Sequence, residues 1–132
     1  RIAMAARQAA VIGRLSKQLP AGAQRFALTT RQQLVAAGSG SEEWQPVGVP
    51  GGAPVLDFAV SGQELWVLLP GGRVGHSPDL GRNWDPPVET GARDATAILF
   101  ANSRRGEIRT RSGALFRTTD GGQSWRPVER KE

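Results

Sequence analysis

The segment Thr118-Thr-Asp-Gly-Gly-Gln-Ser-Trp125 has a second copy upstream in the chain, Ser77-Pro-Asp-Leu-Gly-Arg-Asn-Trp84. Both copies read Ser or Thr, any residue, Asp, any residue, Gly, any residue, Ser or Asn, and Trp. The closing tryptophans are 41 residues apart, and another tryptophan, Trp44, precedes Trp84 by 40 residues. A motif that recurs at a nearly constant interval of this length indicates a repeat protein.

Each unit contains short apolar or alternating runs separated by Gly, Asn, Asp and Pro, which is the pattern of antiparallel strands joined by hairpins. In the last unit these runs are Ala97–Ala101, Gly106–Arg111, Gly113–Thr119 and Trp125–Val128. In the middle unit they are Val55–Val60, Glu64–Leu69, Gly72–Ser77 and Trp84–Val88. The first unit keeps Trp44 but has Ser39 and Ser41 where the others have Asp and Gly, so we interpret it as a degenerate repeat. Four strands in about 40 residues are typical of one propeller blade.

We therefore predict an all-β fold of about three four-stranded antiparallel blades, a partial β-propeller preceded by a short helix. The propeller is expected over residues 25–132, with blades at about 25–50, 51–91 and 92–132. Residues 1–24 predict an amphipathic helix or linker, because apolar residues recur at helical spacing before Pro20 and Gly22: Ala5, Ala9, Ile12, Leu15 and Leu19. The alanine-rich face of this helix argues against a membrane-surface role and favours packing on the propeller or a link to an upstream part.

The repeated motif resembles the Asp-box, or BNR repeat, of sialidases, sortilin-type receptors and photosystem II stability/assembly factors. Residues 118–125 match the motif of the assembly factors nearly verbatim, and the resemblance covers roughly residues 26–128. In such a turn the Asp accepts backbone N–H bonds, the Gly adopts a left-handed conformation and the Trp covers the corner. We therefore expect structural roles for Ser77, Asp79, Gly81, Trp84, Thr118, Asp120, Gly122 and Trp125.

The sequence offers little for catalysis. It contains no tyrosine, so the tyrosine nucleophile of sialidases is missing, and it has no cysteine and a single histidine, His76, which cannot build a usual zinc site. We predict no catalytic residue, no metal, no cofactor and no small-molecule substrate. A carbohydrate-binding or sialidase-like propeller fragment stays open as the alternative, and it would require paired acids beside an exposed tryptophan such as Trp66.

The net charge of +5 comes mostly from arginine, and the last unit is rich in it. Two readings of this cluster stay open: a surface that grips carboxylates or phosphates, or a solvated edge that prevents aggregation. Because no aromatic stacking platform is interleaved with the basic residues, nucleic acid is not an expected ligand. The candidate partner-binding residues are Arg104, Arg105, Arg109, Arg111 and Arg117.

The resemblance to the assembly factors implies a non-catalytic scaffold that binds protein partners, sometimes during assembly of membrane complexes. It also implies an extracytoplasmic location, either periplasmic, lumenal or membrane-associated. Blades at the ends of an incomplete ring expose a sheet face. We therefore expect a protein partner, or self-association, to cover the exposed blade faces.

Overall fold

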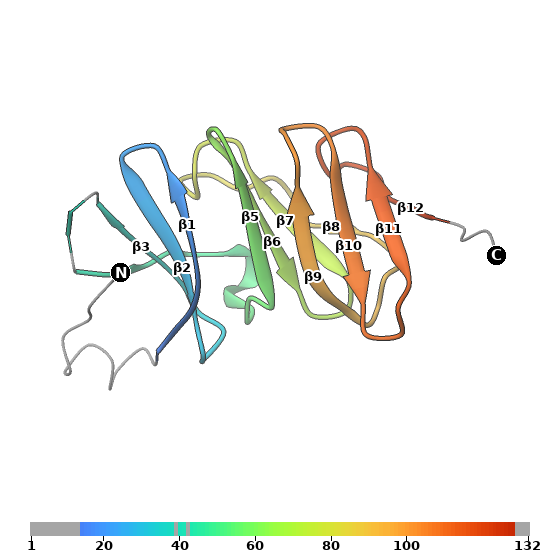
Figure 1. Ribbon diagram of the computed structural model, residues 1–132, viewed down its shortest axis with the longest axis horizontal. Helices are drawn as coiled ribbons and strands as arrows, with labels where there is room; N and C mark the ends of the chain where they lie inside the picture. The colour runs from blue at the N-terminus through green and yellow to red at the C-terminus, as the bar shows by residue number, and fades with distance from the viewer. Residues whose placement is uncertain (1–13, 39, 42, 129–132) are drawn as a thin grey trace.

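Three four-stranded antiparallel sheets make up the protein in the computed structural model, which describes residues 14–38, 40–41 and 43–128. Figure 1 shows them in a row, from blade one in blue and teal to blade three in orange and red. Blade one consists of β1 (Leu15–Ala21), β2 (Gln24–Thr29), β3 (Leu34–Gly38) and β4 (Gln45–Pro46). Blade two consists of β5 (Asp57–Ser61), β6 (Glu64–Leu69), β7 (Arg73–Ser77) and β8 (Val88–Glu89). Blade three consists of β9 (Ala95–Phe100), β10 (Gly106–Thr110), β11 (Leu115–Thr118) and β12 (Arg126–Pro127).

Within each blade the strands follow one another in sequence order, so every blade is a meander. The first strands of neighbouring blades lie together, because β5 contacts both β1 and β9. A short 3-10 turn, Pro50–Gly52, lies on the link between blades one and two. This arrangement agrees with the predicted all-β partial propeller of four-stranded antiparallel blades. Among the described residues, no helix is long and apolar enough to cross a membrane.

The predicted helix over residues 1–24 is wrong where the structure describes the chain, because Leu15–Ala21 form strand β1. The half-buried or buried positions are Leu15, Lys17, Leu19 and Ala21, and the residues between them are exposed. A spacing of four residues between Leu15 and Leu19 fits a helix turn and equally fits two strand periods. Pairing with β2 decides for the strand, so blade one begins at Leu15 and not near residue 25. The rest of the predicted helix, residues 1–13, lies outside the described residues.

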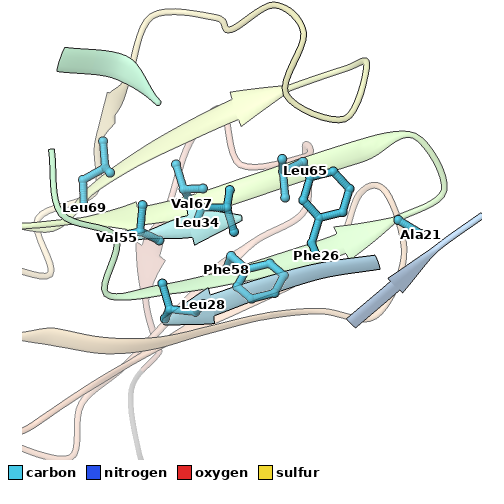
Figure 2. Close-up of a cluster of buried hydrophobic side chains, with 9 residues drawn as sticks. All are labelled: Ala21, Phe26, Leu28, Leu34, Val55, Phe58, Leu65, Val67 and Leu69. Carbon is cyan, nitrogen blue, oxygen red and sulfur yellow. The ribbon is translucent and has the colours of Figure 1, made fainter. Parts of the chain in front are cut away.

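Apolar side chains fill the two joints between blades. Figure 2 shows the first joint, where Phe26 and Leu28 of blade one meet Phe58, Leu65 and Val67 of blade two. The second joint is built from side chains of blades two and three, and its buried members are Ala59, Trp66, Leu68, Val74, Ala92, Ala95, Ile98 and Ile108. The ring of Trp66 stacks on Phe100 with a centroid distance of 3.6 Å, and its indole Nε1 donates to the carbonyl of Gly121 at 2.8 Å.

One buried carboxylate connects the first strands of all three blades, β1, β5 and β9, which we call the inner strands. Asp57 of β5 accepts a hydrogen bond from Lys17 Nζ of β1 at 2.6 Å and another from the amide of Ile98 in β9 at 2.8 Å. Lys17 also donates to the carbonyl of Phe58 at 2.7 Å and lies 5.1 Å from the centre of the Phe58 ring. Asp57 therefore fixes where β1 and β9 lie against β5.

Replacing Asp57 by Ala should lower the free energy of unfolding by about 2 kcal/mol, because the buried Ile98 amide and the Lys17 ammonium both lose their acceptor. Asp57→Asn keeps one acceptor oxygen and should cost less. Urea unfolding followed by tryptophan fluorescence measures both losses. Equal stability of Asp57→Ala and the wild type would show that the apolar joints alone hold the blades.

Candidate functional site

The motif of blade two forms a closed turn between β7 and β8. The buried hydroxyl of Ser77 donates to Asp79 Oδ1 at 2.8 Å and accepts from the amide of Gly81 at 2.7 Å. Asp79 in turn accepts from the amide of Asn83 at 2.8 Å and from its side-chain Nδ2 at 2.6 Å. Both carboxylate oxygens of Asp79 are thus bound inside the turn.

The motif of blade three repeats these bonds between β11 and β12. Thr118 Oγ1 donates to Asp120 Oδ1 at 2.8 Å and accepts from the amide of Gly122 at 3.0 Å. Asp120 accepts from the amide of Ser124 at 3.0 Å and from its hydroxyl at 2.6 Å. Two turns with different sequences therefore share one hydrogen-bond pattern, as expected for structural elements.

Each turn also contacts the blade before it. Gly81 and Gly122 both have φ of +93°, a left-handed conformation that glycine adopts without strain. A Cβ atom at Gly81 would lie 2.9 Å from Val47 Cγ1, and one at Gly122 would lie 3.2 Å from the indole nitrogen of Trp66. The indole N–H of Trp84 donates to the carbonyl of Gly48 at 2.8 Å, whereas that of Trp125 donates to Gly122 within its own turn at 3.0 Å. Glycine at these positions therefore allows close packing against the preceding blade.

Blade one uses an arginine in place of the carboxylate. Arg25 Nη2 donates to the carbonyl of Gly38 at 3.3 Å and to that of Ser41, and its guanidinium lies 5.0 Å from the centre of the Trp44 ring. A cation here binds backbone acceptors of the turn, whereas Asp79 and Asp120 bind backbone donors. The sequence does not reveal this role, because Arg25 lies on β2, far along the chain from Trp44.

The pKa values of both motif carboxyls are lowered by these hydrogen bonds. Asn83 is the main cause at Asp79, whose pKa falls from 3.8 to about 2. The hydroxyl of Ser124 is the main cause at Asp120, whose pKa is also below its ordinary value. Both groups are therefore ionised near neutral pH and are poorly suited to act as general acids.

A carboxyl whose pKa is lowered by folding stabilises the folded state above its ordinary pKa, and this stabilisation is lost as the pH falls towards the lowered value. The melting temperature should therefore drop as the pH decreases from about 5 to about 2. In Asp79→Asn/Asp120→Asn the protein should melt lower at neutral pH and show a shallower acid dependence. Calorimetry at several pH values measures the slope, with the exposed Glu89→Gln as control. An unchanged slope in the double variant would contradict the assignment.

The structure does not bring the five candidate arginines into one cluster. Arg104 and Arg105 lie in the turn before β10, and Arg111 lies just after it, beside Asp94. At about 3.3 Å per strand residue, Arg105 and Arg111 are separated by roughly 20 Å. Arg109 of β10 and Arg117 of β11 lie on the same face, where their Nη2 atoms are 3.9 and 3.3 Å from the carboxylate of Glu107.

Arg126 was not among the predicted partner-binding residues, yet it pairs directly with Arg117 across β11 and β12. Directly paired side chains lie on the same face of a sheet. We call the surface formed by Leu99, Glu107, Arg109, Arg117 and Arg126 the open face of blade three. Leu99, on the edge strand β9 of this sheet, is 44% exposed. The run Trp125–Val128 is predicted as a strand from the sequence, but only the register shows that Arg126 lies opposite Arg117.

The structure provides no support for a glycan platform at Trp66, because this side chain is fully buried between blades two and three. The single histidine is also engaged: His76 Nδ1 lies 2.7 Å from Asp85 Oδ2, and Nε2 contacts Glu64 Oε1. Within the described ranges, no group of three or more His, Cys, Asp or Glu residues could hold a metal ion.

No family model matches the chain. It is 28% identical over 110 residues to the chloroplastic photosystem II stability/assembly factor HCF136 of Arabidopsis thaliana, covering 76% of this chain and 27% of that protein. It is 35% identical over 72 residues to the photosystem II assembly lipoprotein Ycf48 of Synechococcus sp. strain CC9902, covering 53% and 21%. These matches support homology to the photosystem II assembly factors.

Solved structures show the same fold. YCF48 bound to D1 peptide superposes with a TM-score of 0.66 at 20% identity, covering 84% of this chain and 42% of that one. An ancestral GH74 enzyme, AFV00434, superposes with a TM-score of 0.68 at 17% identity, covering 92% and 19%. At such identities the likeness concerns the fold alone. The chain also spans only about a quarter of the length of its curated relatives.

Proposed function

We propose that this chain is a non-catalytic β-propeller scaffold that binds a protein partner and assists assembly or stability of a membrane-associated complex. Its place of action is an extracytoplasmic compartment, periplasmic, lumenal or membrane-associated. The relatives support this proposal, because two of them are photosystem II assembly factors and a solved YCF48 structure holds a D1 peptide. The partner of this chain is a protein segment, and photosystem II itself is not a required part of the proposal.

The observation that carries the proposal is the contrast between satisfied acids and exposed cations. The carboxylates of Asp79 and Asp120 are bound inside their own turns, whereas all five candidate arginines are exposed on or around blade three. Exposed guanidiniums can form paired hydrogen bonds with carboxylates of a partner. The candidate contacts are Arg104, Arg105, Arg109, Arg111 and Arg117.

In cells that produce the protein, a tagged chain should be crosslinked to a protein partner in the membrane-associated fraction. Mass spectrometry identifies the partner, and native gels should show less of its assembled complex when this protein is deleted. Purified protein incubated with polysaccharides and sialosides should release no reducing sugar, with a heat-denatured sample as control. Sugar release would overturn the proposal in favour of the carbohydrate alternative. If no partner is crosslinked and deletion leaves the amount of every complex unchanged, the protein has another role.

A further inference from the structure

The strand registers show which residues of the three blades occupy equivalent positions. The first motif position of each blade, Ala37, Ser77 and Thr118, pairs with Arg25, Leu65 and Gly106. The next residue along the second strand of each blade is Phe26 in blade one, Trp66 in blade two and Glu107 in blade three. Two residues further on, the position is Leu28, Leu68 and Arg109.

In blades one and two these positions form the joint with the next blade. Phe26 and Leu28 pack against blade two, and Trp66 and Leu68 pack against blade three. Blade three has Glu107 and Arg109 instead, so its open face carries charges where the other blades carry large apolar side chains. If a sheet with an apolar face packed against the open face, it would bury these charges without partners, which is unfavourable.

The first strand of blade three, β9, also lacks a side chain equivalent to Asp57 that could bond to a further blade. The registers of the inner strands make Lys17, Asp57 and Ala97 equivalent. Asp57 reaches the amide of Ile98 in the next blade, whereas Ala97 has no polar side chain with which to do so. Both the apolar joint and the carboxylate connection of blade two are thus absent from the open face.

The open face carries more positive than negative charge. Glu107 is a single carboxylate facing two guanidiniums, and the side chains of Arg109 and Arg117 remain 62% and 52% exposed. Such solvated ion pairs contribute little to stability. Arg117 also lies directly opposite Arg126, and like charges at paired strand positions repel. An anionic ligand would relieve this repulsion.

An apolar hollow adjoins these cations. Its volume is about 760 Å³, and its lining includes Leu99, Phe100, Arg105 and Arg117. A ligand that fits both features has carboxylates beside an aliphatic side chain. A second copy of this face does not fit, because it would bring three arginines against three arginines with one Glu107 in each copy.

We infer that the open face of blade three binds an extended, acidic protein segment that carries a leucine-type side chain. The carboxylates bind Arg105, Arg109, Arg117 and Arg126, and the aliphatic group enters the hollow beside Leu99. This inference rests on the proposed scaffold function and specifies its partner. It also separates the contact arginines from Arg104 and Arg111, which lie beyond the two ends of β10.

The test uses the peptide fluorescein-Gly-Asp-Leu-Glu-Ile-Glu-amide and a control peptide with the same dye and with Asn and Gln in place of Asp and Glu. Fluorescence anisotropy should show binding of the acidic peptide to the full chain and at least about tenfold weaker binding of the control peptide. Raising the salt from about 50 mM to about 500 mM should weaken binding of the acidic peptide by a similar factor, since screening shortens the reach of the charges.

Arg109→Glu/Arg117→Glu should weaken binding of the acidic peptide by about tenfold or more. Leu99→Ser should weaken it by a smaller factor. The matched control, Arg14→Glu/Arg93→Glu, makes the same charge change at exposed arginines off this face and should stay within about twofold of the wild type. Melting temperatures verify that each variant is folded.

Failure of the acidic peptide to bind, or equal weakening by the two double variants, would overturn the inference. A crosslinked cellular partner retained by Arg109→Glu/Arg117→Glu would also overturn it, while leaving the scaffold function intact. Loss of that partner with this variant alone would support it.

Discussion

The hydrogen bonds of Asp57 set the relative placement of the three blades. Apolar side chains fill the joints between blades, but burial of apolar surface has no preferred direction and tolerates sliding of one sheet over another. The bonds from Lys17 at 2.6 Å and from the Ile98 amide at 2.8 Å are directional, so they favour the observed alignment of β1 and β9 with β5. Because Asp57 accepts both, blade two fixes the positions of its two neighbours through a single side chain.

The repeated turns complement this inner connection at the opposite edge of each blade. The loops after β7 and β11 close on their own carboxylates and lie against the preceding blade through Gly81 and Gly122. Blade one reaches a comparable result with opposite charge, since Arg25 binds the carbonyls of Gly38 and Ser41. Each of these turns therefore needs a side chain that hydrogen-bonds its backbone groups, and either a carboxylate or a guanidinium can fill this role.

The sequence predicts the repeating architecture well because its information is local. The hairpin signals around Asp79 and Asp120 each depend on a few neighbouring residues, and the tryptophans show that these local signals recur every 40 or 41 residues. Strand β1 was missed because Leu15 and Leu19 fit two periodicities and only pairing with β2 selects one of them. The role of Asp57 was missed for a similar reason, since both of its partners belong to other blades.

The arrangement of the candidate arginines could not be predicted from the sequence for a different reason. The arginines of blade three are close in sequence, but β10 carries Arg105 and Arg111 to opposite ends. The change from Trp66 and Leu68 to Glu107 and Arg109 becomes visible only when the strand registers align the blades. Charge density along a chain is therefore a poor guide to a surface on a sheet, where side chains two residues apart on one strand or opposite each other on neighbouring strands lie side by side.

The tryptophans give this fold a built-in set of optical reporters. Trp84 donates to Gly48 on the link from blade one, and Trp66 donates to Gly121 of blade three. The emission of an indole depends on its hydration and on the groups around it. Variants that retain only Trp84 or only Trp66 would therefore distinguish, by wavelength and intensity, the opening of the first joint from that of the second.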